Sequence, residues 1–249
     1  MITPEAPKKL FLLDAYALIF RAYYAFIKNP RINTKGLNTS AIFGFTNVLL
    51  DVMKNEKPSH LAVVFDPPEE TFRSVTFADY KANREETPED IRVAVPWIMR
   101  VLEGFGVPVI MVKGYEADDV IGSIAKHAEK DGFVTYMMTP DKDFGQLVSE
   151  NIFIFKPGRG GNPAEIWGIK EVCARYEIDR PEQVIDILGL MGDAVDNIPG
   201  VPGIGEKTAM KLVQQYGSVE GLYENTSALK GKQKENVENH REQAFMSKH

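Results

Sequence analysis

The chain has 249 residues, of which 44% are hydrophobic, and it carries a net charge of −6. This content allows a full core in one large domain, or in one domain with a smaller lobe. No segment approaches the roughly 18 consecutive apolar residues of a membrane span. The first residues lack the features of a signal peptide, and the single cysteine, Cys173, excludes an intramolecular disulfide. These features predict a cytoplasmic protein with no membrane partner.

Short hydrophobic runs alternate with segments of helical period, and several runs are followed closely by an aspartate. The clearest cases are residues 10–13 before Asp14, 61–65 before Asp66 and 135–138 before Asp141. Near-continuous apolar runs indicate strands buried on both faces, so we predict an α/β fold with a mostly parallel central sheet flanked by helices. In such sheets the ligand crevice lies outside the carboxyl ends of the strands. The aspartates are expected at that edge.

The segments between these strands predict two helices and a long polar loop. A helix over residues 39–54 connects the first two strands, as a parallel crossover requires. Residues 67–88 are polar with interleaved bases and aromatics, and a long loop of this kind is usually functional. A second helix follows over residues 89–103, with a kink at Pro96, and then a strand over residues 107–112.

More carboxylates follow at the start of the next helix, which runs to about residue 130. Glu116 and Asp119 share a helical face at i,i+3 and are expected to be direct ligands, with Asp118 acting through water. Part of this acidity can instead serve the helix N-terminus. Asp141 and Asp143 stand two residues apart in a turn and can converge on one ion.

These acids form a set of nine that predicts a divalent-metal site. The set comprises Asp14, Asp66, Glu116, Asp118, Asp119, Asp141, Asp143, Asp193 and Asp196. Oxygen ligands with no nearby His or Cys favour Mg²⁺ or Mn²⁺ over zinc. The set exceeds what one Mg²⁺ can use, so at least two ions are expected. With the nine acids set aside, the bases are in slight excess, and the net acidity does not exclude DNA.

From about Glu165 the pattern is helical, and residues 198–209 form a Gly/Pro hairpin between two apolar helices. This is typical of the helix-hairpin-helix class, which holds a DNA phosphate through hairpin amides and a helix N-terminus. A nucleotide-binding P-loop is excluded because Glu206 stands between Gly205 and Lys207. A proline-containing turn after a helix also replaces the strand that a P-loop requires.

With these residues assembled, the chain resembles the flap endonuclease family, in particular the 5′-nuclease (5′-3′ exonuclease) domains of bacterial DNA polymerase I. The motifs are Phe65-Asp66-Pro67-Pro68, Tyr80-Lys81-Ala82-Asn83-Arg84, Tyr115-Glu116-Ala117-Asp118-Asp119, Thr139-Pro140-Asp141-Lys142-Asp143, and Gly192 with the hairpin Pro199–Gly205. The resemblance implies a PIN-like nuclease core over residues 1–165 with a helical arch at about 70–105. It also implies a helical region over 166–249 with its helix-hairpin-helix at about 185–216, truncated at the C-terminus.

The resemblance also implies the activity and the roles of the site residues. It implies a structure-specific 5′-3′ exonuclease and 5′-flap endonuclease that hydrolyses DNA phosphodiesters with two metals, as in primer removal and DNA repair. One metal is held by Asp14, Asp66, Glu116 and Asp119 with Asp118 beside them, and the second by Asp141, Asp143, Asp193 and Asp196. Lys81 and Arg84 act at the scissile phosphate alongside Asp14, Asp66 and Asp141. The implied DNA contacts are Arg21, Arg73, Tyr80, Lys81, Arg84, Gly200, Val201, Gly203, Ile204, Gly205, Lys207 and Thr208, with K⁺ at the hairpin.

The implied partners are DNA with a 5′ flap, nick or 5′ end and a polymerase domain in cis. The resemblance also implies a monomer that lies in the bacterial cytoplasm and associates with the nucleoid through DNA. One departure is Ala15, where the family usually has Gly. Three alternatives stay open: a structure-specific DNA-binding module without catalysis, an RNase H-like ribonuclease, and an aspartyl phosphatase. The last would want an acid at position 16, where Tyr16 stands.

Overall fold

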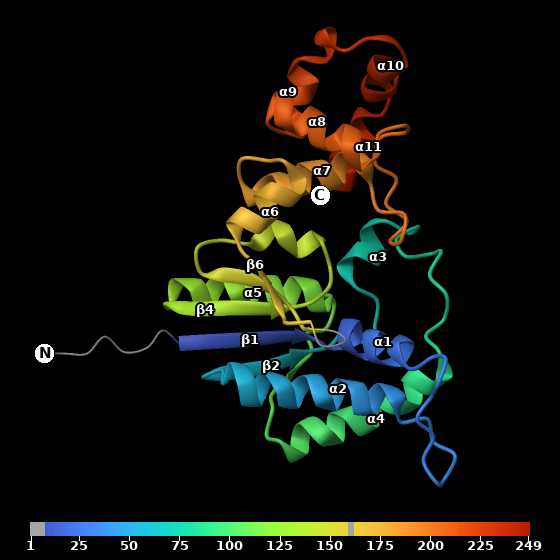
Figure 1. The fold of residues 1–249 in the computed structure, drawn as a ribbon. Coiled ribbons are helices and arrows are strands. Elements are labelled where there is room, and N and C mark those ends of the chain that lie inside the picture. The colour runs from blue at the N-terminus through green and yellow to red at the C-terminus, as the bar shows by residue number, and fades with distance from the viewer. Residues whose placement is uncertain (1–7, 159–161) are drawn as a thin grey trace, which may run out of the picture. The chain divides into compact units, whose positions relative to one another are not determined.

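The computed structural model describes residues 8–158 and 162–249, and the chain divides into two units (Figure 1). The first, called here the sheet unit, comprises Met1–Thr71, Glu86–Phe144 and Asn151–Ile166. The second, the helical unit, comprises Phe72–Glu85, Gly145–Glu150 and Trp167–His249. The helical unit therefore includes part of the segment expected to form an arch.

Among the described residues, the sheet has six strands in the order β3-β2-β1-β4-β5-β6. Their bounds are β1 Lys8–Asp14, β2 His60–Val64, β3 Val109–Ile110, β4 Phe133–Met138, β5 Ile152–Lys156 and β6 Glu165–Trp167. Strand β1 pairs in parallel with both β2 and β4, while β2 pairs in parallel with β3 and β4 with β5. The predicted mostly parallel α/β sheet is confirmed.

Helices cover both faces of this sheet. The helices α1 Ala15–Ala25, α2 Ser40–Asp51 and α4 Glu89–Gly104 lie on one side, and α5 Ala117–Lys130 lies on the other (Figure 1). Because side chains alternate along a strand, β1 directs Phe11 and Leu13 into one core with Phe45 of α2 and Ile98 of α4. Burial on both faces explains the unbroken apolar run in β1.

Three expectations need correction. The strand expected over 107–112 is only the two-residue edge strand β3, which follows Pro108, a residue without an amide donor. The chain does not become helical at Glu165, because residues 165–167 join the sheet as β6 and the next helix begins at Ile169. The helix expected to reach residue 54 changes into the π-helical turn η1 Val52–Glu56, which ends at a left-handed Lys57.

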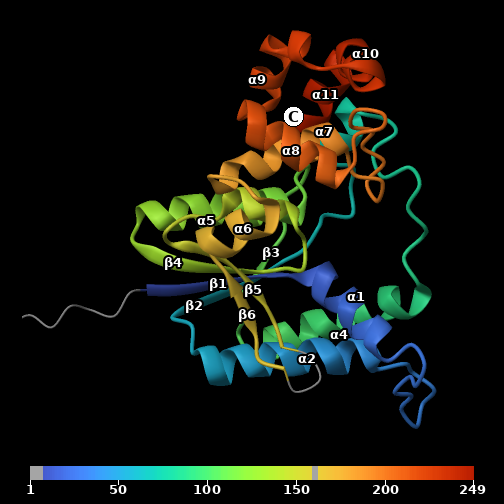
Figure 2. The same cartoon turned by 45° about the horizontal axis from the view of Figure 1, so that its top comes forward.

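The helical unit is built around α7. Its elements are α3 Phe72–Thr76, α6 Ile169–Tyr176, α7 Val184–Met191, α8 Glu206–Tyr216, α9 Val219–Glu224, α10 Gly231–Asn239 and α11 Arg241–Lys248, with the short 3₁₀ turns η3 Pro181–Gln183 and η4 Thr226–Ala228. A further 3₁₀ turn, η2 Asp143–Leu147, begins in the sheet unit and ends in the helical unit. Helix α7 packs against α8 and α11 (Figure 2). Its buried Asp186 accepts a bond of 2.6 Å from the Lys248 ammonium and one of 2.9 Å from the Val219 amide. These bonds join three helices through one carboxylate.

None of the described helices is long and apolar enough to cross a membrane.

The close packing of α1 on α2 generates a stability prediction. A Cβ at Gly44 of α2 would lie 2.6 Å from the Cβ of Ala22 in α1, closer than packed atoms tolerate. Gly44→Ala should therefore lower the free energy of unfolding by about 1–3 kcal/mol, although alanine favours helix. Urea denaturation measures this change.

Gly104→Ala is the matched control, because Gly104 ends α4 and a Cβ there meets no atom within 4 Å. That variant should be neutral or more stable by up to about 1 kcal/mol. Equal effects of the two substitutions would contradict the packing argument.

Candidate metal and nucleic-acid site

Three acids of the sheet unit lie at the carboxyl edge of adjacent strands. Asp14 ends β1 and stands opposite Val64 of β2, Asp66 follows β2, and Asp141 follows β4. Asp14 is also the N-cap of α1, because its side chain accepts a hydrogen bond of 3.1 Å from the Ala17 amide. The sequence placed these acids at one edge, and the structure brings them to it.

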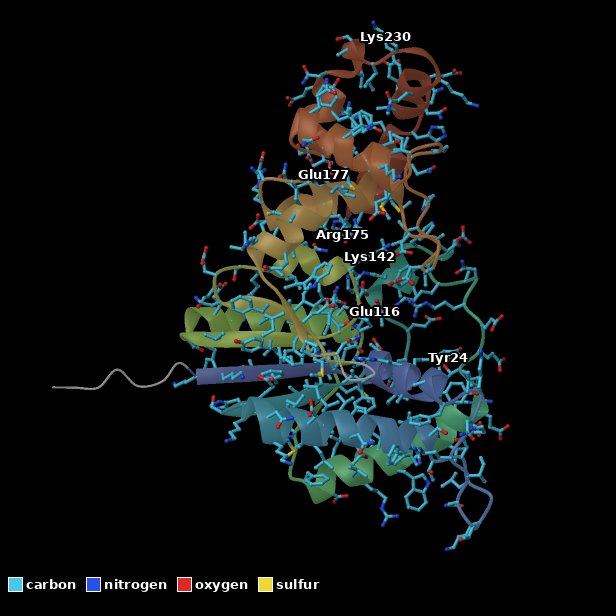
Figure 3. The ribbon with its side chains drawn as sticks, in the orientation of Figure 1. Tyr24, Glu116, Lys142, Arg175, Glu177 and Lys230 are labelled. Atoms are coloured by element: carbon cyan, nitrogen blue, oxygen red, sulfur yellow. The ribbon has the colours of Figure 1, made fainter. Side chains whose placement is uncertain are left out.

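The acids at the start of α5 form a reciprocal helix cap. Glu116, which is labelled in Figure 3, is the N-cap of α5. It accepts from the Asp119 backbone, while the Asp119 carboxylate accepts from the Glu116 amide at 3.0 Å. Asp66 accepts from the Ala117 amide at 2.8 Å, which ties the acid after β2 to the same helix end. Asp118 lies in the first turn and is half-buried. The acidity of this motif thus serves the helix terminus and remains at the edge of the sheet.

Thr139 links two of the predicted site carboxylates, and the sequence reasoning missed it. Its buried hydroxyl donates to the Asp14 carboxylate at 3.1 Å and accepts from the Asp141 amide at 3.2 Å. Asp141 in turn accepts from the Asp143 amide at 2.9 Å. The sequence feature that could have indicated this role is the position of Thr139 between the last residue of β4 and Asp141.

Burial and neighbouring charges act together on Asp14. Burial raises the pKa of its carboxyl from 3.8 to about 6, and the Ala17 amide partly opposes that rise. The carboxylates of Asp66 and Asp141 also raise this pKa by repulsion. The site therefore concentrates negative charge around a side chain that is almost fully enclosed.

A hard divalent ion fits this set of residues. Their donors are carboxylate oxygens, with no imidazole or thiol in the set, and a cation relieves the repulsion felt by Asp14. Within residues 8–158 and 162–249, no three carboxylate, imidazole or thiol groups are already arranged around one ion position. Several of the oxygens are engaged as caps of α1 and α5 instead.

Asp193 and Asp196 belong to the helical unit and lie in a closed loop, residues 193–198, called here the acidic loop. Asp193 and Ile198 exchange backbone hydrogen bonds of 2.8 and 2.7 Å across its base. Gly192 and Gly200 flank the base with positive φ angles, and a Cβ on either would overlap the backbone of the other. The expectation that these acids share an ion with Asp141 and Asp143 stays a prediction.

The basic residues of the 80–84 motif contact the acidic loop directly. The Lys81 amide donates to the Asp196 carbonyl at 2.9 Å, and the Arg84 guanidinium forms an ion pair with the Asp196 carboxylate. The Lys81 ammonium lies 4.0 Å from that carboxylate, and the Tyr80 hydroxyl lies 3.4 Å from it. The 80–84 motif, expected to bind phosphate, and Asp196, expected to bind metal, therefore contact each other within the helical unit.

The other predicted DNA contacts from the first half of the chain have protein partners. Tyr80 is buried and has the Lys81 ammonium 4.8 Å from its ring centre. Arg73 stacks on Phe72 at 4.7 Å, and Arg21 donates to the carbonyls of residues 157 and 158 at 2.8 and 3.1 Å. The role of each in DNA binding stays a prediction.

The predicted hairpin contacts divide into internal and outward-facing groups. Val201 and Ile204 are buried, and their amides donate to the carbonyls of Leu190 and Val201. Gly200 is held by Ser247 and Gln243 of α11. The remaining predicted contacts are at or near the start of α8: Gly203 and Gly205 in the turn, and Lys207 and Thr208 in its first turn.

Family models match the chain along nearly its whole length. Residues 9–177 match the 5′-3′ exonuclease N-terminal resolvase-like domain, and residues 179–249 match the 5′-3′ exonuclease C-terminal SAM fold. The chain belongs to the 5′-3′ exonuclease family. The nuclease family predicted from the sequence is therefore confirmed.

Two relatives of this exonuclease chain differ in how much of their length it covers. It is 42% identical over 243 residues to DNA polymerase I of Bacillus subtilis, which is 97% of this chain and 27% of the relative. It is 38% identical over 218 residues to a 5′-3′ exonuclease of Aquifex aeolicus, which is 88% of this chain and 73% of the relative. The chain thus spans about a quarter of the polymerase relatives and most of the exonuclease relative.

Solved structures confirm the fold of the exonuclease chain. A T5 5′-exonuclease with bound zinc superposes with a TM-score of 0.77 at 21% identity, covering 96% of this chain and 88% of the other. A T5 flap endonuclease complex with DNA and metal ions gives a TM-score of 0.75 at 21% identity, covering 96% and 87%. At this identity the likeness establishes the fold alone.

The raised pKa of Asp14 predicts a pH-dependent stability. The folded state holds this proton up to about pH 6 and the unfolded state only to about 3.8, so ionisation costs stability as the pH rises through this window. In EDTA, Asp14→Asn should raise the free energy of unfolding by about 2–3 kcal/mol at pH 8 and by little at pH 4. Urea denaturation at the two pH values measures the difference.

Asp131→Asn, at an exposed carboxylate that ends α5, is the control and should show no such difference between pH 8 and pH 4. A gain from Asp14→Asn that is equal at both pH values would show that ionisation of Asp14 is not its cause.

Proposed function

We propose that the chain is a structure-specific 5′-3′ exonuclease and 5′-flap endonuclease that hydrolyses DNA phosphodiesters, as in primer removal and DNA repair. The observation that carries this proposal is the group of carboxylates at the sheet edge, where Thr139 joins Asp14 to Asp141. Membership of the 5′-3′ exonuclease family supports it.

Divalent ions, Mg²⁺ or Mn²⁺, are the proposed cofactors. Asp14, Asp66, Glu116 and Asp119 would hold one ion with Asp118 beside them, and Asp141, Asp143, Asp193 and Asp196 are the other proposed ligands. When bound, the ions supply a water nucleophile near neutral pH and stabilise the charge that develops on the phosphodiester oxygens. The chain's own contribution is to enclose Asp14 and to fix Asp14 and Asp141 through the Thr139 hydroxyl.

Lys81 and Arg84 are the proposed cationic residues at the scissile phosphate. Arg84 is half-exposed, and its guanidinium is held at the Asp196 carboxylate. A guanidinium that is both fixed and accessible can donate to a phosphate oxygen as well, because it carries five donors in a rigid fork. Lys81 adds a second positive charge 4.0 Å from the same carboxylate.

The hairpin is proposed to hold the duplex through phosphates, without reading bases. The start of α8 offers amide donors and a positive helix end, which favour an anion. Gly203 and Gly205 are exposed in the turn and let a phosphate approach the backbone closely. We propose K⁺ between hairpin carbonyls and this phosphate.

The proposed partners are DNA with a 5′ flap, nick or 5′ end and a polymerase domain in cis. Support for the latter comes from the DNA polymerase I relatives, of which the chain covers about a quarter. We propose that the protein acts as a monomer in the bacterial cytoplasm.

The proposed activity is tested with a 5′-labelled flap DNA and a linear single strand of the same sequence, each with Mg²⁺ and with EDTA. Cutting near the flap junction that requires Mg²⁺ and spares the linear strand supports the proposal. Binding of the flap without cutting would instead support a DNA-binding module.

Asp141→Ala tests the role of the sheet-edge acids. It removes a carboxylate of the proposed metal site, so cleavage should fall by at least about a hundredfold while flap binding stays close to wild type. Cleavage rate and gel-shift affinity are measured on the same DNA. Asp131→Ala, at the far end of α5, should change neither, and an Asp141→Ala variant that cuts at the wild-type rate would remove Asp141 from the site.

Lys207→Ala tests the phosphate contact proposed for the hairpin. The affinity for nicked duplex should fall steeply with salt, and this variant should reduce the slope of log affinity against log salt by about one. Lys170→Ala, at an exposed position on α6, should leave the slope unchanged. An affinity that does not depend on salt would contradict binding through phosphates.

A further inference from the structure

Two asparagines form reciprocal bonds between the 79–84 segment and the acidic loop. The Asn83 side-chain amide donates to the Ala194 carbonyl at 2.8 Å. The Asn197 side-chain amide donates in the opposite direction, to the Asp79 carbonyl, at 2.7 Å. Each bond joins residues more than a hundred positions apart in the sequence, and both lie within the helical unit.

The backbone at both sides of this contact adopts a conformation that needs support. Lys81 has a φ of 57° and Asn197 a φ of 60°, both in the left-handed region. A lysine is rarely found there, because its Cβ crowds the backbone, whereas asparagine tolerates it. The Lys81 amide is fixed by its 2.9 Å bond to the Asp196 carbonyl, between the two asparagine bonds. The set of three bonds therefore fixes the Lys81 backbone and, with it, the direction in which the Lys81 side chain points.

The ion pair of Arg84 with Asp196 does not explain this arrangement by itself. Half-exposed ion pairs contribute little, because water screens them and long side chains lose freedom. Asn83 is exposed and immediately precedes Arg84. Its bond to Ala194 therefore acts locally, because it holds the backbone next to Arg84 in place.

We infer that Asn83 and Asn197 are positioning residues, which clasp the 79–84 segment onto the acidic loop and so hold Lys81 and Arg84 beside Asp196. This inference rests on the proposed function, in which Lys81 and Arg84 act at the scissile phosphate. The asparagines act on the reaction through the two basic side chains and do not contact DNA.

Asn83→Ala and Asn197→Gly each remove one bond of the clasp. Glycine is chosen at position 197 because it keeps the left-handed backbone accessible. The net free energy that one such hydrogen bond contributes corresponds to about a fivefold change in the equilibrium constant for local opening. Hydrogen exchange of residues 79–84, measured in EDTA without DNA, should therefore be about fivefold faster in each variant, with an unchanged melting temperature. Asn239→Ala, exposed on α10, is the control and should match wild type.

Flap cleavage in Mg²⁺ measures the consequence for the reaction. Each variant should lower kcat by about fivefold with little change in KM. In an Arg84→Ala, Lys81→Ala background, Asn83→Ala should have no further effect, because the groups it positions are gone. Unchanged exchange of 79–84, unchanged kcat, or a full fivefold loss in that background would overturn the inference. Failure of the proposed function is separate, since it appears as wild-type protein that does not cut the flap.

Discussion

The structure of the sheet unit depends on the position of Asp14, which ends the central strand β1 and caps α1. The strand buries this carboxylate, and the ends of the neighbouring strands bring Asp66 and Asp141 close enough to repel it. A site of this kind gains stability from a proton or a cation, and oxygen ligands select a hard ion. Under the proposed function, the same placement that weakens the metal-free fold prepares the site to bind a divalent ion.

In the helical unit, the basic side chains of Lys81 and Arg84 lie beside the carboxylate of Asp196. Asp196 accepts from the Lys81 amide through its carbonyl and pairs with Arg84 through its carboxylate. The acidic loop can take this role because the glycines at 192 and 200 close its base and Asp193 bonds to Ile198 across it. Its shape therefore comes from the backbone and does not depend on the ion pair.

Helix termini serve as anchors for functional groups throughout the chain. Asp14 caps α1, the Glu116 and Asp119 pair caps α5, and Gly205 precedes α8 at the hairpin. At the first two positions the capping bonds orient carboxylates, and at the third we propose that the helix end binds a DNA phosphate. Ala15 is fully buried as the first residue of α1, so a methyl group fits directly after Asp14.

The sequence by itself determined the parallel sheet, the edge that carries the acids and the Gly/Pro hairpin, because each follows from local periodicity or turn chemistry. It did not predict β5 or β6, and it extended β3 beyond the two residues that pair. Only the tertiary structure decided that Thr139 joins Asp14 to Asp141, and that Asn83 and Asn197 clasp two distant segments. These three bonds join residues 111, 118 and 125 positions apart, far beyond the span of a helical turn or a hairpin, so no local pattern records them.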